Sequence, residues 1–391
     1  MRPAGKEILA YLQDCEAEML AAIEAMAGIE SPSSDAASQI PLREFLVPMF
    51  AELGFVCVAL TGRNSGGHLY ARPRERQRRD PRQLMLGHYD TVWPRGTLRS
   101  MPFQRQQDVV HGPGVYDMKG GIAQMLFALR AIREFGLRPA LTPVVFLNSD
   151  EEIGSRESTR HIRRIARVCE RVFVLEPSLG PDGYLKTARK GIGRFTVTVH
   201  GRAAHAGLDP DAGASAILEL SHVIQSLFAL NDPERGITVN VGTIDGGLRP
   251  NVIAPKSTAV VDVRVRTHED GERISAAIHS LQPATPGVQL ETEGAIGRPA
   301  LEPTPRNQVL WRLAKNYATE LDLDLQQGIA GGGSDGNTTS QLTATLDGLG
   351  PVGDGAHAAH EHLYVARTLE RTALLTMLLL APPHDAARTA S

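Results

Sequence analysis

Three short apolar runs, each followed by polar residues, set the strongest limit on what this 391-residue chain can fold into. The runs span residues 84–87, 144–147 and 172–175, and helical stretches at about 121–134 and 154–165 separate them. Strands that are apolar throughout are buried on both faces, and strands that alternate with helices pair in parallel. The sequence therefore predicts an α/β fold with a mostly parallel sheet covered by helices on both faces.

The residue pattern changes near Gly191, where apolar and polar residues begin to alternate. Residues 194–200 alternate as in a strand with one buried face. The elements that follow complete the order strand, helix, strand, strand, helix, strand, which predicts an α+β sandwich with one open sheet face. We therefore expect residues 190–299 to form a second domain, inserted between two parts of the first domain at 1–189 and 300–391.

Composition argues against several classes of protein. The net charge of −3 does not favour general electrostatic binding to nucleic acid or to an anionic membrane. The chain has no run of about 18 apolar residues, and charges in its N-terminal segment indicate an amphipathic helix rather than a secretory signal. Cys15, Cys57 and Cys169 form neither a disulfide framework nor a metal-binding pair. We expect a cytoplasmic protein with neither nucleic acid nor a membrane as partner.

Histidines and carboxylates follow the predicted strands. In parallel sheets, binding and catalytic residues lie at the carboxyl ends of the strands. They lie in five segments: His88-Tyr89-Asp90, the glycine-rich loop around Asp117, Asp150-Glu151-Glu152, Glu176-Pro177, and a glycine-flanked segment that contains His357. Imidazoles combined with carboxylates favour a zinc-type metal, whereas oxygen ligands alone favour magnesium or calcium. Two histidines and three carboxylates can hold two ions that share one carboxylate, and a further carboxylate can accept a proton from water.

These segments resemble the signatures of a family of co-catalytic zinc peptidases and deacylases. The family includes carboxypeptidase G, aminoacylase, acetylornithine deacetylase and succinyl-diaminopimelate desuccinylase. The matching segments are residues 87–92, 112–121 and 148–155, and the likeness extends over about residues 10–380. Within the family, residues 88–93 and 332–335 are most similar to the glutamate carboxypeptidase type.

The resemblance implies a set of metal ligands. Asp117 would bridge two zinc ions in each subunit, and cobalt or manganese could occupy the same positions. His88 and Glu176 would complete one metal site, and Glu152 and His357 the other.

Two further acidic residues would act beside the ions. Glu151 would be the general base and then the general acid, and Asp90 would orient the His88 ring. The resemblance also implies a cis peptide bond between Asp117 and Met118.

The choice of His357 rests on register, because His360 and His362 lie close by in the sequence. The family motif places its histidine after a glycine and one further residue, with a glutamate four residues later. His357 and Glu361 fit this register, whereas the other two histidines do not. We expect His360 and His362 to be surface residues.

The insert would supply substrate-binding residues and, by the resemblance, the contacts of a homodimer. His205 matches a histidine that helps to hold the substrate across the dimer, and Asn251 matches an asparagine that contacts substrate. Arg298 would grip a free carboxylate, because a planar guanidinium forms two parallel hydrogen bonds with one. Gly333 and Ser334 would offer backbone donors nearby. The alternatives are a turn-capping role for His205 and a hinge role for Arg298.

The implied function is that of a metallo-carboxypeptidase. A water shared by the two ions would attack an amide bond next to a free carboxylate, with Glu151 as general base. The substrate would be a small peptide, for example one with C-terminal glutamate, or an N-acyl amino acid. The basic residues Lys186, Arg189 and Lys190 could read an acidic side chain or belong to a hinge strand.

The sequence has two alternative interpretations. An N-acyl amino acid deacylase of the acetylornithine deacetylase or aminoacylase type would use the same residues. A non-catalytic binding protein is disfavoured, because the base and all five ligand positions are present.

Overall fold

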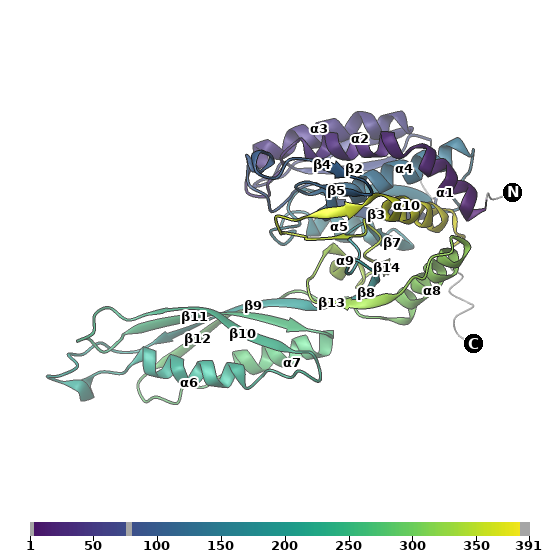
Figure 1. Ribbon diagram of the computed structural model, residues 1–391. Helices are drawn as coiled ribbons and strands as arrows, with labels where there is room; N and C mark the ends of the chain where they lie inside the picture. Colours follow the sequence, from purple (N-terminus) through teal and green to yellow (C-terminus); the bar gives the residue numbers. More distant parts are fainter. Residues whose placement is uncertain (1–3, 76–79, 384–391) are drawn as a thin grey trace. The chain divides into compact units, whose positions relative to one another are not determined.

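The computed structural model describes residues 4–75 and 80–383 and divides into two compact units (Figure 1). The main unit contains Met1–Thr187, Pro303–Gly328 and Ser334–Ser391, and the insert contains Ala188–Glu302 and Ile329–Gly333. Residues 1–3, 76–79 and 384–391 of the predicted first domain lie outside the described residues.

A six-stranded sheet in the order β1-β2-β6-β3-β7-β14 forms the centre of the main unit. Its strands are β1 (Phe55–Leu60), β2 (His68–Pro73), β6 (Thr142–Asn148), β3 (Arg82–His88), β7 (Arg171–Val174) and β14 (Ala344–Leu346). The last four pair in parallel, whereas β1 and β2 add an antiparallel edge. The predicted α/β class is therefore confirmed, and the three apolar runs are the central strands. This antiparallel edge was not predicted, although residues 55–60 of β1 form a continuous apolar run; β1 is only partly buried.

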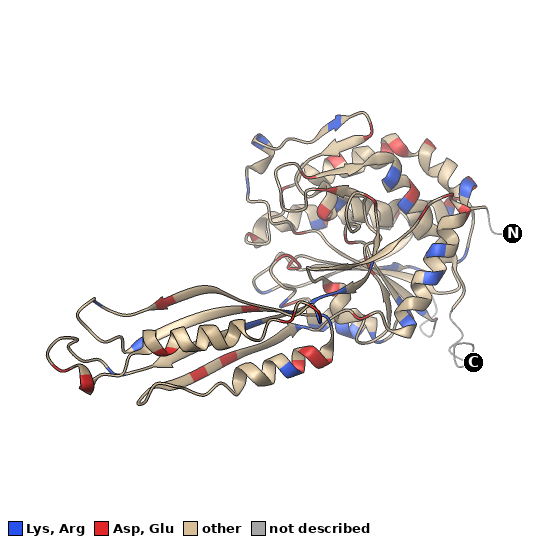
Figure 2. Ribbon diagram, turned by 60° about the horizontal axis from the view of Figure 1, so that its bottom comes forward, with Lys and Arg blue, Asp and Glu red and all other residues tan. Residues whose placement is uncertain are grey.

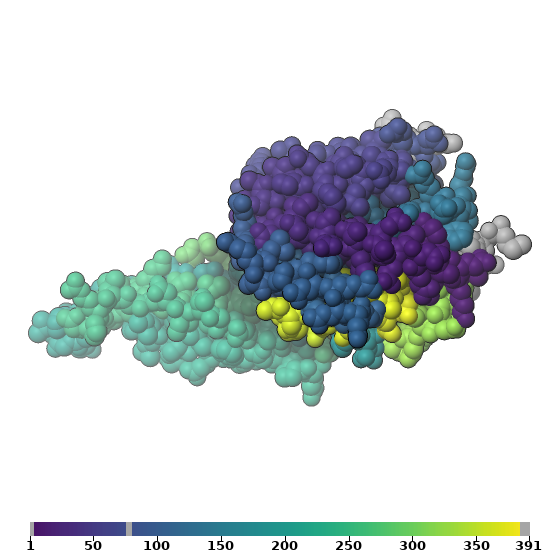
Figure 3. Space-filling model, turned by 45° about the horizontal axis from the view of Figure 1, so that its top comes forward, coloured from purple at the N-terminus to yellow at the C-terminus, as the bar shows by residue number. Residues whose placement is uncertain are grey.

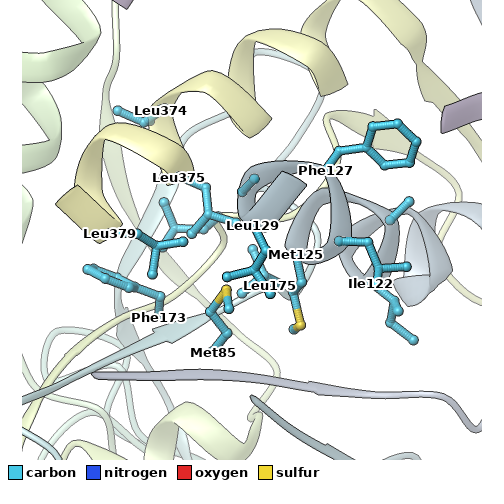
Figure 4. Packing of buried hydrophobic residues seen from close by; sticks show 14 of the residues in the cluster. Met85, Ile122, Met125, Phe127, Leu129, Phe173, Leu175, Leu374, Leu375 and Leu379 are labelled. Atoms are coloured by element: carbon cyan, nitrogen blue, oxygen red, sulfur yellow. The ribbon is translucent and has the colours of Figure 1, made fainter. Parts of the chain in front are cut away.

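Successive residues of the central strands pack on opposite faces of this sheet. Met85 lies in a large core with helices α4 (Gly120–Glu134) and α10 (Val365–Leu380), as Figure 4 shows. Its neighbour Leu84 lies in a smaller core against α5 (Thr159–Ala166). Burial on both faces explains why these strands are apolar throughout.

Further helices complete the main unit. They are α1 (Gly5–Asp14), α2 (Glu16–Ala27), α3 (Ala36–Glu52), α8 (Pro305–Glu320) and the short α9 (Asp335–Thr339). Figure 3 shows residues of the N-terminal helices covering one face of this unit. Within residues 4–75 and 80–383, no helix has the length and apolar character needed to cross a membrane.

Two small sheets accompany the main sheet. One pairs β13 (Gln327–Ala330) with β8 (Leu185–Arg189). The other has the order β15-β16-β5-β4 and consists of β15 (Gly353–Asp354), β16 (His362–Tyr364), β5 (Val109–His111) and β4 (Gln104–Gln106). The Asp117 loop begins after β5 and the His357 loop ends at β16. Because β5 and β16 are paired, the two loops have neighbouring anchors.

The insert contains an antiparallel four-stranded sheet in the order β10-β11-β9-β12. Its elements are β9 (Gly191–His200), α6 (Ala216–Phe228), β10 (Thr238–Gly246), β11 (Lys256–Val265), α7 (His268–His279) and β12 (Gln289–Arg298). Alternate residues of β9, including Phe195 and Val197, are buried in a core shared with both helices. The predicted order of elements and the α+β sandwich are confirmed. Acidic and basic residues are interspersed along both units (Figure 2).

The C-terminal end of α10 is held by a buried arginine. The Arg171 guanidinium donates to the carbonyl oxygens of Leu378, Ala381 and Pro382 and to the side chain of Gln83. The last carbonyl groups of a helix have no partner within the helix. Arg171 therefore satisfies these groups and attaches α10 to the sheet.

We predict that Arg171→Met lowers the free energy of unfolding by about 2–3 kcal/mol, because buried carbonyl groups lose a charged donor. Denaturant unfolding of the full chain measures this loss. The matched control is Arg167→Met at an exposed position, which should change stability by less than about 0.5 kcal/mol. Equal unfolding midpoints for the two variants would contradict the role of Arg171.

Candidate metal centre and substrate-binding residues

Six predicted site residues meet at the carboxyl ends of the central strands of the main unit. His88 is the last residue of β3, Glu151 and Glu152 follow β6, and Glu176 follows β7. Asp117 and His357 come from the two loops that are anchored on the paired strands β5 and β16. The parallel strands thus collect residues that lie far apart in the sequence.

The Asp117 carboxylate lies between the two histidines. Its Oδ1 atom is 3.2 Å from Nε2 of His88, and its Oδ2 atom is 3.5 Å from Nε2 of His357. His88 Nε2 is also 3.3 Å from Oε1 of Glu176, and His357 Nε2 is 3.0 Å from Oε2 of Glu152. One carboxylate therefore connects two imidazole–carboxylate pairs, as a bridging ligand would.

Glu151 lies in the same cluster. Ligand atoms of His88, Glu151 and Glu176 fall within 4.8 Å of one another, and so do those of His88, Asp117 and Glu152. Because these two groups share His88, they form one continuous cluster rather than two separate ones.

Unpaired buried atoms show that this cluster fits metal ions. Within the described part of the chain, His88 Nε2, Asp117 Oδ1 and Glu152 Oε1 are buried and make no hydrogen bond. Buried polar atoms are normally hydrogen-bonded, and atoms that are not need another partner. Imidazole nitrogen with carboxylate oxygen is a donor set that suits zinc.

The pKa shifts of the residues in the cluster also indicate a site for cations. Burial lowers the pKa of His88, but the adjacent carboxylates of Asp117, Asp90 and Glu176 outweigh this effect and leave the pKa well above its usual value. Hydrogen bonds with Asp117 and Glu152 raise the pKa of His357 to about 10. Burial raises the pKa of Glu152 to about 7. The carboxylates thus draw protons onto the imidazoles, and a divalent ion would supply the same positive charge.

Asp90 is fully buried and positions the turn that carries Glu151. Its carboxylate accepts hydrogen bonds from the backbone N–H groups of Glu151 and Glu152, each at 3.2 Å, and from the Ser33 hydroxyl at 2.6 Å. His88 Nδ1 is 3.0 Å from the backbone oxygen of Asp90 and 3.5 Å from its carboxylate. A proton on Nδ1 leaves the lone pair of Nε2 for a ligand bond.

Glu361 has a positioning role that the sequence analysis missed. Its buried carboxylate accepts hydrogen bonds from the backbone N–H groups of Gly114, Tyr116 and Asp117 and from the Trp93 indole. Burial raises the pKa of Glu361, although these hydrogen bonds oppose the shift. Glu361 therefore ties the His357 loop to the Asp117 loop. The sequence signal for Glu361 was its spacing of four residues from His357, but this spacing does not reveal which groups Glu361 hydrogen-bonds.

Two predictions about the same loops are confirmed. The Asp117–Met118 peptide is cis. His360 is exposed and His362 half-buried, and neither belongs to the metal-binding groups found among residues 4–75 and 80–383.

His205 and Asn251 lie together in the insert. The backbone N–H of Ala206 donates to the Asn251 carbonyl at 3.0 Å, and His205 pairs with Val252. His205 Nδ1 accepts the N–H groups of Gly207 and Leu208 at 3.2 and 3.1 Å. A neutral ring in this arrangement carries its proton on Nε2. The exposed histidine therefore caps a turn and also offers an outward N–H donor.

Arg298 and Gly333 lie side by side elsewhere in the insert. Arg298 ends β12 and is half-buried, and a β-carbon placed on Gly333 would be 3.5 Å from its Cδ atom. Arg189 donates to the carbonyl oxygens of Gly332 and Gly333, at 3.2 and 3.4 Å. These bonds favour the hinge interpretation of Arg189 over recognition of an acidic substrate.

The prediction for Ser334 needs correction. Its backbone N–H already donates to Oδ1 of Asn337 at 2.9 Å, and its hydroxyl donates to Asp347 at 2.5 Å. Ser334 is the fully buried N-cap of α9. The helix cap uses the Ser334 backbone N–H that was expected to face the substrate. Only the Gly333 backbone N–H therefore remains a candidate donor to the substrate.

Comparisons with known proteins identify peptidases and related hydrolases as similar. The family model described as "Peptidase dimerisation domain", of the M20 type, matches residues 187–283. Carboxypeptidase G2 from Pseudomonas sp. (strain RS-16) is 28% identical over 358 residues, which cover 88% of this chain and 84% of that protein. Succinyl-diaminopimelate desuccinylase from Azoarcus sp. (strain BH72) is 27% identical over 363 residues, or 85% and 92% of the two chains.

Solved structures share the fold. Aminopeptidase PepT from Bacillus cereus ATCC 10987 superposes with a TM-score of 0.76 at 18% identity, covering 93% of this chain and 98% of that chain. The M20 family metallo-carboxypeptidase Sso-CP2 from Sulfolobus solfataricus has a TM-score of 0.70 at 14% identity, covering 93% and 99%. Residues 187–283 therefore match the dimerisation domain of M20 peptidases, and the similarity over most of the chain indicates a hydrolase of the metallopeptidase and amidohydrolase type.

Proposed function

We propose that this protein is a di-zinc metallo-carboxypeptidase that cleaves the amide bond next to a free carboxylate in a small peptide. The position of the Asp117 carboxylate, with one oxygen toward His88 and the other toward His357, is the observation that carries the proposal. The likeness to carboxypeptidase G2 supports a carboxypeptidase, and the resemblance of residues 88–93 and 332–335 to the glutamate carboxypeptidase type favours a substrate with C-terminal glutamate.

The chain's own residues account for the metal site. His88 and Glu176 would hold one zinc ion, Glu152 and His357 the other, and Asp117 both. Bound there, the ions would act as Lewis acids that lower the pKa of water and polarise the amide carbonyl. Cobalt or manganese would suit the same donors.

Glu151 would move the proton in the reaction. It belongs to the cluster with His88 and Glu176 and is not needed as a ligand, so its carboxylate can serve as a base. The hydrogen bond from its backbone to Asp90 fixes the turn that carries it. Glu151 would accept a proton from the attacking water and deliver it to the leaving nitrogen.

The insert would bind the rest of the substrate. The outward Nε2–H of His205 is suited to stabilise the oxyanion that develops on the amide carbonyl, with Asn251 beside it. Arg298 would pair with the free carboxylate through two hydrogen bonds. Gly333 has no side chain and would leave space for the substrate next to Arg298. Its backbone N–H would be a further donor there.

The geometry of the insert supports a homodimer with shared sites. Arg298 pairs with Ile192 at the beginning of β9, whereas His205 follows His200 at the other end of that strand. Eight residues of strand separate the two ends by roughly 26 Å. One insert therefore cannot offer both residues to a dipeptide-sized substrate. We propose that His205 of the partner subunit completes each site.

An exposed apolar surface offers the contacts for such a dimer. Ile217 on α6, Ile244 on β10 and Leu248 in the following loop are 49%, 65% and 72% exposed. Ile217 lies close to Gly247, so the helix and the loop form one surface beside the edge strand β10. Identical edge strands can pair across a two-fold axis and bury this surface.

A second candidate uses the same machinery. The likeness to succinyl-diaminopimelate desuccinylase favours an N-acyl amino acid deacylase, whose substrate also has a free carboxylate beside the amide. Hydrolysis of folate-like, N-acetylated and dipeptide substrates by the metal-reconstituted protein separates the two. We also propose a cytoplasmic location, which the three free cysteines support.

We predict that Glu151→Gln lowers kcat by at least about 100-fold while the metal content stays as in the wild type, because only the proton acceptor is lost. Asp117→Ala is the contrasting variant and should lose metal, since it removes a ligand from both ions. Turnover assays and elemental analysis measure the two effects. Turnover like the wild type in Glu151→Gln would refute its role as base.

Removal of the Arg298 side chain should weaken substrates with a free carboxylate. The loss of a charge-assisted pair costs about 1.5 to 3 kcal/mol, so kcat/KM of Arg298→Ala should fall roughly 10- to 150-fold. Amidated analogues should be spared, and Arg194→Ala on the exposed part of β9 is the matched control. An equal loss for both substrate forms would show that Arg298 is only structural.

Subunit mixing tests the shared site. If His205 acts in the partner's site, a heterodimer of inactive His205→Ala and Glu151→Gln chains contains one site with both substitutions and one with neither. Up to about half of the heterodimer sites should regain activity by symmetry. Mixing Glu151→Gln with Glu152→Ala is the control and should restore nothing. Absence of recovery despite proven exchange, or a fully active monomer in sedimentation, would disprove the arrangement.

A further inference from the structure

A row of metal-binding side chains crosses the small sheet of the main unit, apart from the cluster around Asp117. Asp354 lies directly opposite His362 in the strand register, and His362 lies directly opposite His111. Directly opposed residues point to the same face, with their β-carbons about 4.5–5.5 Å apart. The alternate residues Val110 and Leu363 are fully buried in the core on the other face. The row therefore lies on the outer face, where both imidazoles are half-buried and Asp354 is exposed.

The two imidazoles of this row are close and one of them is oriented as a ligand. The ring centroids of His111 and His362 are 5.3 Å apart. His362 Nδ1 lies 2.9 Å from the backbone oxygen of His360 and donates a hydrogen bond to it. The lone pair of His362 is therefore on Nε2. Metal-binding histidines commonly donate their second ring nitrogen to a backbone carbonyl in this way.

The surroundings of His111 favour its unprotonated ring. Burial and the nearby His362 and His360 lower the pKa of His111. Among the residues that the structure describes, neither His111 nor His362 forms an ion pair with a carboxylate. An imidazole binds a metal through its unprotonated nitrogen, so the absence of a competing carboxylate at these rings favours coordination.

We propose that His111 and His362 form a peripheral site for one transition-metal ion of the Zn²⁺, Ni²⁺ or Cu²⁺ type, with water as the further ligand. Imidazole nitrogen is a preferred donor for these ions. The site is separate from the proposed function and does not rest on it.

The position of this site gives it a structural effect. His111 ends β5, six residues before Asp117, and His362 begins β16, five residues after His357. An ion that bridges the two histidines would hold the bases of both loops from outside, while Glu361 links them from inside. Because the ion binds only the folded sheet, it would also raise the thermal unfolding midpoint.

The test counts metal in the full chain. Zinc-loaded protein is dialysed against Ni²⁺, and the sum of zinc and nickel per chain is measured, so exchange at the central cluster leaves the sum unchanged. The wild type should bind one equivalent more than the double variant His111→Asn/His362→Asn. The matched control His200→Asn replaces a partly exposed histidine of the insert and should keep the additional equivalent.

A second measurement keeps the proposal testable if the double variant does not fold. Electron paramagnetic resonance of Cu²⁺ added to the zinc-loaded wild type should show coupling to two imidazole nitrogens, and each single variant should lose one. Zinc-dependent activity of the single variants should stay near that of the wild type. Equal metal sums in the wild type and the histidine variants, or copper spectra that the substitutions leave unchanged, would overturn the proposal.

Discussion

The position of the Asp117 carboxylate between His88 and His357 is the arrangement on which the rest of the site depends. Each oxygen faces one imidazole, and each imidazole faces a further carboxylate, Glu176 or Glu152. Burial alone would raise the pKa of Asp117, but the adjacent imidazoles of His357 and His88 outweigh it and hold the pKa far below its usual value. The carboxylate therefore stays charged in a buried position, where it can serve two cations at once.

The fold supports this carboxylate from two sides. The parallel strands β3, β6 and β7 fix His88, the Glu151–Glu152 turn and Glu176 at one edge of the sheet. The paired strands β5 and β16 fix the two loops that bring Asp117 and His357. Glu361 joins these loops through the Asp117 backbone, and Asp90 joins the His88 strand to the Glu151 turn. Second-layer contacts of this kind orient ligands before a metal arrives.

Much of the fold and of the metal site could be predicted from the sequence, because local sequence patterns mark these parts. Apolar runs identified the strands, alternation identified the insert, and motif register selected His357 over His360 and His362. The remainder depended on contacts between distant segments. The apolar run of β1 does not by itself show that this strand pairs at an antiparallel edge. The four donors of Glu361 come from two segments, Trp93 and the loop at 114–117. The backbone donor of Ser334 is used within the cap of a short helix that was not predicted.

The central claim is that two metal ions share Asp117. Anomalous diffraction at the zinc edge from crystals of the zinc-loaded protein tests it most directly. The account predicts two peaks about 3.5 to 4 Å apart, one bound by His88 and Glu176, the other by Glu152 and His357, with Asp117 in contact with both. A single peak in this cluster, or two peaks without a shared Asp117, would contradict it.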